Sequence, residues 1–166
     1  VITSISGIRG TIGGSSKDSL TPLEIVKFTS AYGAWVRENS KVKPRVVVGR
    51  DARISGEMVD LLVTGTLVAL GIDVINIGLA TTPTTEIAVI HEQADGGIIL
   101  TASHNPKNWN ALKLLNNKGE FITQKDAEKI FEQAKNIEIL EFSRVEELGE
   151  IIRDSEYVHK HIDLIK

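Results

Sequence analysis

The residues Ser103-His104-Asn105-Pro106 are the sharpest chemical feature of this 166-residue chain. They follow a short apolar run that is typical of a buried strand. A serine at the end of such a strand, followed at once by a histidine, could act as a nucleophile beside a proton carrier or a phosphate ligand. The alternative is an ordinary loop, in which the serine caps a turn and the proline ends the strand. Taken in isolation, the four residues favour the loop.

Lys113 is a second candidate, because it interrupts the otherwise apolar segment 111–115 just beyond the serine. One interpretation is an edge strand whose lysine faces water, which is common. The other is a lysine directed back at Ser103, where it could take part in acid–base chemistry. The sequence pattern is compatible with both.

Cationic side chains and hydroxyls gather in the segments that follow the predicted strands. In open α/β sheets these segments meet at the carboxyl edge of the sheet, where ligands bind. Guanidinium groups, hydroxyls and glycine-opened backbone amides are the donors that a phosphate needs. The segments are 4–10, 49–56, 78–84 and 101–110, and their cations are Arg9, Arg50, Arg53 and Lys107. The sequence therefore predicts a phosphate-handling site, although Asp51 and Arg53 could instead pair with each other as a brace within their loop.

The glycine spacing and the composition exclude several classes of protein. The glycines match neither the dinucleotide fingerprint nor the P-loop. Lys and Arg total 19 and Asp and Glu total 22, so the net charge is −3. No bulk field attracts nucleic acid or an anionic membrane, and any anion site must be local. The chain has no Cys, which excludes disulfides and Cys-based zinc sites.

No apolar run approaches the ~18 residues that span a bilayer, and no signal peptide is visible. We therefore expect a cytoplasmic protein that binds neither nucleic acid nor a membrane. The chain begins with Val1, and its only methionine is Met58, so we expect it to be cut from something longer at its start.

Strand-like and helix-like segments alternate along the chain. Short β-branched runs predict central strands at 46–48, 72–77 and 98–100. Helices are expected to begin after Thr21, Ser55, Thr81 and Thr123, with Gly71 ending the second. This order predicts an α/β fold with three layers (α/β/α), in which a mostly parallel sheet has helices on both faces. We expect one domain over residues 1–153 and a helix or linker over residues 154–166.

Together these segments resemble the first domain of the α-D-phosphohexomutase family, which includes phosphoglucomutase, phosphomannomutase and phosphoglucosamine mutase. Residues 101–106 resemble the family's phosphoserine loop, and residues 110–113 resemble the segment after it that carries a lysine. Residues 6–10 and 49–56 resemble its amino-terminal motif and the loop after its second strand. The resemblance covers nearly the whole chain in order and spacing. It departs from the family pattern at Trp109 and at Ala111, where the family usually has Gly.

The resemblance implies a phosphomutase mechanism. Ser103 would donate a phosphoryl group to a hexose 1- or 6-phosphate, giving a bisphosphorylated sugar, and would take back the other phosphoryl group after the sugar reorients. Arg9 and Lys113 would be acid–base or electrostatic partners, and His104 would orient substrate or phosphate. The residues expected to bind substrate or phosphate are Ser6, Arg50, Arg53 and Asn105.

The family also implies one Mg²⁺ ion, held by the phosphoryl oxygen on Ser103 and by Asp residues of a D-G-D-type loop. This chain has no Asp-x-Asp sequence. The metal carboxylates are therefore expected in a missing second domain, and the loops that read the sugar in a third and a fourth domain. A phosphosugar and these domains II–IV would be the partners, and a bisphosphorylated sugar the activator. The isolated chain is expected to be inactive.

We keep two alternatives. A non-catalytic α/β module that binds anions would also lack the metal loop, although a simple binder needs no exposed serine beside His and Lys. The second alternative keeps the chemistry and changes the sugar. Glucose or mannose phosphate is favoured over glucosamine phosphate, but the three differ at C2 and nothing in this segment reads C2.

Overall fold

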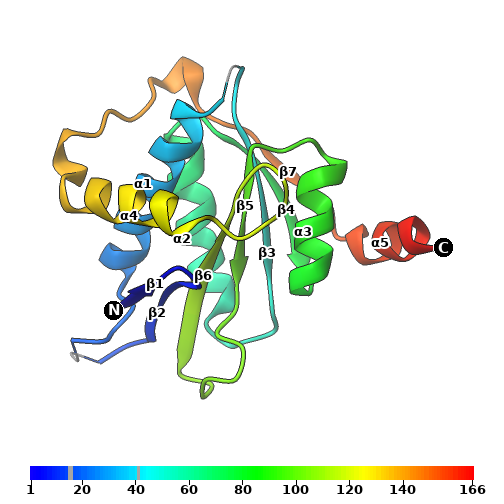
Figure 1. Cartoon of the computed structure of the whole chain (residues 1–166), viewed down its shortest axis with the longest axis horizontal. Coiled ribbons are helices and arrows are strands. Elements are labelled where there is room, and N and C mark those ends of the chain that lie inside the picture. Colours follow the sequence, from blue (N-terminus) through cyan, green and yellow to red (C-terminus); the bar gives the residue numbers. More distant parts are fainter. Residues whose placement is uncertain (15–16, 41) are drawn as a thin grey trace.

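The chain forms one sheet between two layers of helices (Figure 1). The computed structural model describes residues 1–14, 17–40 and 42–166. In this part of the chain the sheet has seven strands, in the order β1-β2-β6-β5-β3-β4-β7. The strands are β1 Ile2–Ser4, β2 Gly7–Thr11, β3 Arg45–Arg50, β4 Asp73–Leu79, β5 Gly96–Leu100, β6 Trp109–Leu115 and β7 Ile151–Arg153. The helices are α1 Pro22–Glu38, α2 Gly56–Ala69, α3 Thr82–His91, α4 Gln124–Lys135 and α5 Tyr157–Ile165, with short 3-10 turns η1 Ile137–Ile139 and η2 Val145–Glu147.

The predicted three-layer α/β/α fold is confirmed, and the sheet itself is mixed. Strands β5, β3, β4 and β7 run parallel. Strands β6, β2 and β1 continue the sheet with antiparallel pairings. Because β2 is antiparallel to β6, which is itself antiparallel to β5, β2 points the same way as the parallel strands. Among the described strands only β6 and β1 are reversed, so the mostly parallel direction that we predicted is confirmed. Strand β6 is reversed because the short connection 101–108 turns the chain directly from β5 into β6, whereas a parallel pair needs a longer crossover.

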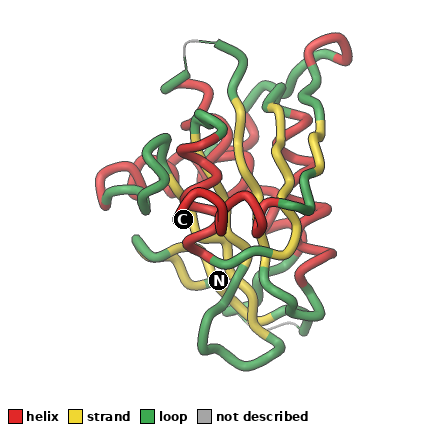
Figure 2. The backbone as a smooth tube through the Cα atoms, turned by 90° about the vertical axis from the view of Figure 1, so that its right-hand side faces the viewer, coloured by secondary structure: helices red, strands yellow, loops and turns green. Residues whose placement is uncertain are grey.

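The two faces of the sheet bury separate cores. Val46 and Val48 of β3 contribute to the core under α1, α2 and α4, whereas Val47 contributes to the core under α3 and α5. This alternation follows from the two-residue period of a strand, and a strand buried on both faces reads as a continuous apolar run. Figure 2 looks onto the face that α3 and α5 cover, with the strands behind them.

Local capping explains where several helices begin and end. Thr21 and Thr123 cap α1 and α4 as predicted, each hydroxyl accepting a backbone N–H at 3.2 Å. Ser55 stands at the start of α2 but makes no capping bond. Its hydroxyl instead accepts a hydrogen bond from Nδ2 of Asn110 at 2.9 Å, which ties α2 to β6. Gly71, with a φ of +78°, ends α2 as predicted, because a left-handed residue after the helix favours glycine.

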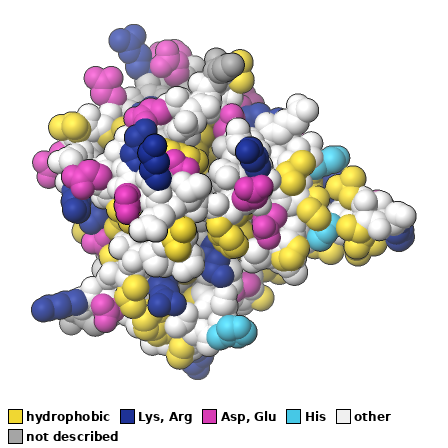
Figure 3. Space-filling view, in the orientation of Figure 1, with side chains coloured by type: hydrophobic (Ala, Val, Ile, Leu, Met, Phe, Trp, Pro, Cys, Tyr) yellow, Lys and Arg dark blue, Asp and Glu magenta, His cyan; other side chains and the backbone are white. Residues whose placement is uncertain are grey.

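The C-terminal residues add a strand and a helix to the fold. Strand β7 pairs with β4 at the edge of the sheet, a strand that the irregular sequence of residues 137–152 did not reveal. Helix α5 lies against α3, where the hydroxyl of the buried Tyr157 is 2.7 Å from Nδ1 of His91. Its outer face exposes apolar side chains, which gather on the protruding helix in Figure 3. The boundary at residue 153 stays a prediction.

Lys, Arg, Asp and Glu side chains are interspersed over the face that Figure 3 shows, so no large field of one sign covers it. Among the described residues, each helix is too short or too polar to cross a membrane.

Candidate active site

The Ser103 loop, which we define as residues 101–108, lies where β3 and β5 end. These two strands are parallel neighbours, with Arg50 opposite Leu100 at their carboxyl ends. The segment after β3 therefore lies beside the Ser103 loop, and the backbone N–H of Asp51 donates to Leu100 at 3.1 Å. Both segments lie at the lower edge of the domain in Figure 1. The sequence-based expectation that these segments meet agrees with the structure.

Ser103 and Lys113 are in direct contact. Nζ of Lys113 donates a hydrogen bond to Oγ of Ser103 at 2.7 Å. Strand β6, which carries Lys113, lies between β2 and β5 and is not an edge strand. The interpretation as an edge lysine that faces water is therefore wrong. Because the chain reverses through the Ser103 loop, β6 returns alongside β5 and brings the lysine, opposite Ile99, back to the serine.

A small cavity of about 100 Å³ opens beside this pair of side chains. Five of the predicted residues line it, namely Ser6, Arg9, Ser103, Asn105 and Lys113. The first two come from the β1–β2 hairpin, because β2 pairs with β6 on the side away from β5. We expected Arg9 in a loop, but it lies within β2, exposed and opposite Ala111. An ammonium, a guanidinium and three hydroxyls around one exposed serine make a suitable environment for a phosphoryl group.

Two other predicted residues lie outside this cavity. His104 is exposed on the Ser103 loop, next to the serine but not in the cavity lining. Arg50 lies against α2, where its Nε is 3.7 Å from a carboxylate oxygen of Asp60. Its Nη1 also donates to the backbone carbonyl of Asp51 at 3.3 Å. The structure therefore brings the cation of Arg50 to α2 rather than to Ser103.

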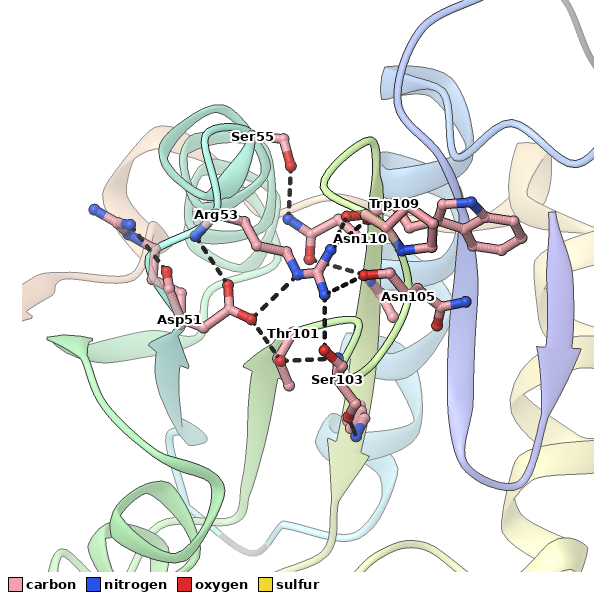
Figure 4. Close-up of polar contacts among 12 residues, drawn as sticks. Asp51, Arg53, Ser55, Thr101, Ser103, Asn105, Trp109 and Asn110 are labelled. Carbon is pink, nitrogen blue, oxygen red and sulfur yellow. Dashed lines mark hydrogen bonds and ion pairs between the residues drawn. The ribbon is translucent and has the colours of Figure 1, made fainter.

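Arg53 occupies the inside of the Ser103 loop (Figure 4). Its Nη1 donates to the carbonyl oxygens of Pro106 at 2.6 Å and Trp109 at 3.1 Å. Its Nη2 donates to those of Ser103 at 2.9 Å and Asn105 at 2.8 Å. These two nitrogens carry four N–H groups, so four carbonyl oxygens occupy them all. In this structure Arg53 has no terminal N–H left for the phosphate that we expected it to bind.

The backbone of Ser103 adopts an unusual conformation. Its φ is +49°, and among the described residues Gln93 is the only other non-glycine residue with a positive φ. Such conformations cost about 1–3 kcal/mol and persist where the surroundings enforce them. Thr101, which sequence analysis did not single out, provides one restraint, because its Oγ1 accepts the N–H of Ser103 at 3.2 Å. A hydroxyl two residues before the serine is the sequence signal that could have indicated this turn.

The described part of the chain was also compared with the requirements of a metal site, because the resemblance implies one Mg²⁺ ion. Among the described residues, no group of three His, Asp or Glu side chains lies close enough to hold a metal ion. Asp51 is the carboxylate of the neighbouring loop, but its Oδ2 already accepts the hydroxyl of Thr101 at 2.6 Å and lies 3.4 Å from Nε of Arg53.

Comparisons with known proteins agree with the family resemblance noted in the sequence analysis. A family model described as phosphoglucomutase/phosphomannomutase, alpha/beta/alpha domain I, matches residues 2–141. A phosphoglucomutase/phosphomannomutase of Thermococcus kodakarensis is 39% identical over 160 residues, which cover 95% of this chain and 34% of that protein. A probable phosphoglucosamine mutase of Pyrococcus furiosus is 38% identical over 165 residues, covering 96% of this chain and 34% of that protein.

Solved structures show the same fold. A putative phosphomannomutase from Thermus thermophilus superposes with a TM-score of 0.75 at 28% identity, over 94% of this chain and 33% of that one. A phosphoglucomutase/phosphomannomutase family protein from Burkholderia thailandensis superposes with a TM-score of 0.78 at 24% identity, over 97% of this chain and 34% of that one. The chain thus spans about a third of the length of the curated relatives it matches.

Proposed function

We propose a function from the family of this chain, which belongs to the α-D-phosphohexomutases and matches their first α/β/α domain. In this proposal the chain carries the phosphoserine of a longer phosphohexomutase. The parent protein would interconvert hexose 1-phosphate and hexose 6-phosphate through a bisphosphorylated sugar. The observation that carries this proposal is the 2.7 Å hydrogen bond from Nζ of Lys113 to Oγ of the exposed Ser103, inside a cavity that Arg9 also lines.

In this proposal Ser103, Lys113 and Arg9 have different roles in phosphoryl transfer. In the forward step the bond from Oγ of Ser103 to phosphorus breaks, and a bond forms from phosphorus to a sugar hydroxyl oxygen. The sugar hydroxyl loses one proton and Oγ gains one, so the step leaves a free serine and a bisphosphorylated sugar. Lys113 lies where it donates to Oγ as negative charge develops on that atom. Arg9 offsets the charge of about −1.5 to −2 that a phosphoserine carries. Return of the second phosphoryl group from the sugar restores the resting phosphoserine.

His104, Asn105 and Ser6 are proposed to bind substrate. They lie on the Ser103 loop and the β1–β2 turn, where a sugar phosphate would approach the serine. Arg50 and Arg53 are not included, because their guanidinium groups contact Asp60 and the loop carbonyls respectively. Glucose or mannose phosphate is the favoured substrate and glucosamine phosphate the alternative. A bisphosphorylated sugar is the proposed activator, and the cytoplasm the proposed location.

Mg²⁺ would neutralise charge on the transferring group when it is bound. This chain would contribute one ligand, a phosphoryl oxygen on Ser103. The other ligands are proposed to be Asp residues of a second domain of the parent, and domains III and IV would read the sugar. The 166 residues alone are accordingly expected to show no mutase turnover in the presence of Mg²⁺ and sugar phosphate.

The test is the replacement Ser103→Ala in the full-length parent, with Ser155→Ala, an exposed serine outside the site, as the matched control. The wild type and the control should carry a stoichiometric phosphoryl adduct by intact-mass measurement and should convert sugar phosphates. The Ser103→Ala variant should lose both the adduct and the activity, because nothing replaces a covalent nucleophile. Near wild-type rates for this variant on every sugar phosphate would defeat the proposal. A parent without any mutase activity would favour the anion-binding module.

A further inference from the structure

We propose that Arg53 is the positioning residue of the Ser103 loop, and that together with Asp51 it holds Oγ of Ser103 in place for phosphoryl transfer. This inference rests on the proposed function and deepens it. It replaces the phosphate-binding role that the sequence suggested for Arg53. The role is not catalytic in itself, because Arg53 contacts the loop backbone and no reacting atom.

The contacts of Arg53 extend along the Ser103 loop from the serine to the first residue of β6. Its two terminal nitrogens bind the carbonyl oxygens of residues 103, 105, 106 and 109 at 2.6–3.1 Å. The loop therefore wraps around one guanidinium group with its carbonyls directed inward (Figure 4). A planar guanidinium presents donors in a rigid fork, whereas the lysine ammonium is a compact charge with three donors. Only an arginine at position 53 can serve all four carbonyls.

Asp51 completes the restraint on Ser103 from both sides. Through Arg53, whose Nε lies 3.4 Å from its Oδ2, it supports the bond to the carbonyl of Ser103. Through Thr101, which donates to Oδ2 at 2.6 Å, it supports the bond from the N–H of Ser103. The peptide groups on both sides of the serine are thus held, and with them the φ of +49°. This conformation sets the direction of Cα–Cβ, and hence the position of Oγ relative to Lys113.

The electrostatics of Arg53 also favour positioning over phosphate binding. Its side chain is 13% exposed, and the carboxylate of Asp51 offsets its charge at close range. The cations beside the cavity differ, because Arg9 is exposed and Lys113 points at Oγ. The positive charge beside a phosphate on Ser103 would therefore come from Arg9 and Lys113, whereas Arg53 would hold the backbone of the Ser103 loop.

The experiment compares Arg53→Met and Arg53→Lys with wild type in the full-length parent. Arg37→Met is the matched control, because Arg37 also binds backbone carbonyls, those of Leu70 and Glu141, but at the amino-terminal edge of the parallel strands. Both Arg53 variants should lower kcat by about 10²-fold, the order that a misplaced reacting group costs, with KM changed by less than about threefold. Arg37→Met should leave kcat unchanged.

A second variant covers the case in which the Arg53 variants fail to fold. Thr101→Val keeps the side-chain shape and removes the acceptor of the Ser103 N–H, so it should lower kcat in the same way. Backbone amide hydrogen exchange across residues 102–109 gives a readout independent of activity. Exchange should accelerate in this loop in the Arg53 and Thr101 variants, and stay at the wild-type rate in Arg37→Met.

Several outcomes would overturn the inference. A raised KM with unchanged kcat in the Arg53 variants would indicate a phosphate ligand instead. Full activity in Arg53→Lys, or unchanged loop exchange in Arg53→Met, would show that the four carbonyl contacts are dispensable. These failures are distinct from failure of the proposed function. If Ser103→Ala is inactive and Arg53→Met is fully active, the phosphoserine mechanism stands and the positioning role falls. If the parent has no mutase activity, the exchange measurement still decides whether Arg53 holds the loop.

Discussion

Replacing Lys113 with Met in the full-length parent should slow phosphoryl transfer by about 10²–10⁴-fold, the range that a positioned proton donor or acceptor typically contributes. The structure supports this magnitude because Nζ lies within hydrogen-bond distance of Oγ of Ser103, at 2.7 Å. At 1.36 kcal/mol for each factor of ten, the loss corresponds to about 2.7–5.4 kcal/mol of transition-state stabilisation. Met retains an unbranched stem of similar length, so folding stability should change by no more than about 0.5 kcal/mol.

The assay for Lys113→Met is steady-state conversion of glucose 1-phosphate, mannose 1-phosphate and glucosamine 1-phosphate, each started with the matching bisphosphate. Lys118→Met is the control, because Lys118 is an exposed lysine in the turn just after β6. The control should keep the wild-type rate, and thermal unfolding should give the same midpoint for all three proteins. A near wild-type rate for Lys113→Met would refute the role of Lys113 in phosphoryl transfer and would show that its contact with Ser103 does not contribute to the rate. A lowered midpoint would instead assign the loss to folding.

Two further predictions concern stability and are tested on the chain by thermal unfolding. Gly7→Ala should lower the stability of the fold by about 1–3 kcal/mol, since φ is +128° and a Cβ would lie 2.4 Å from the carbonyl oxygen of Leu112. The control Gly13→Ala, also at positive φ but with open space around it, should cost less. Burial raises the pKa of Tyr32 above its usual 10.0, so the unfolded chain releases this proton first and stability should fall as pH rises above about 10. Tyr32→Phe should remove that loss of stability at alkaline pH. It should also cost about 1–3 kcal/mol at neutral pH, because the buried hydroxyl lies 2.7 and 3.1 Å from two backbone carbonyls of the sheet. An unchanged loss at alkaline pH in Tyr32→Phe would refute the assignment to Tyr32.

Features that depend on near neighbours in the chain were predictable from the sequence. The apolar run 46–48 indicates a strand buried on both faces, and Val47 and Val48 indeed contribute to opposite cores. Thr21 and Thr123 cap their helices because the hydroxyl and the N–H that it accepts are three residues apart. The expectation that Ser55 caps α2 was wrong for the opposite reason. Its hydroxyl accepts a hydrogen bond from Asn110, which is distant in the sequence.

Features that depend on strand order were not predictable in this way. Strand β7 is only three residues long and all three are exposed, so its pairing with β4 leaves little hydrophobic pattern in the sequence. The antiparallel return of β6 is a second case, because a short loop between two apolar runs does not reveal which strand lies beside which. This return decides that Lys113 faces Ser103 from an interior strand.

The sequence by itself determined the chemical inventory of this protein: a Ser-His-Asn-Pro loop after a buried strand, a lysine within the next strand, and arginines in the adjoining segments. Only the tertiary structure decided which of these cations serves which purpose. Arg9 and Lys113 line the cavity at Ser103, whereas Arg53 binds the loop carbonyls and Arg50 lies at α2. The physical reason is that a side chain's partners across a sheet depend on strand order and register, which arise from packing of the whole core, and not on spacing along the chain.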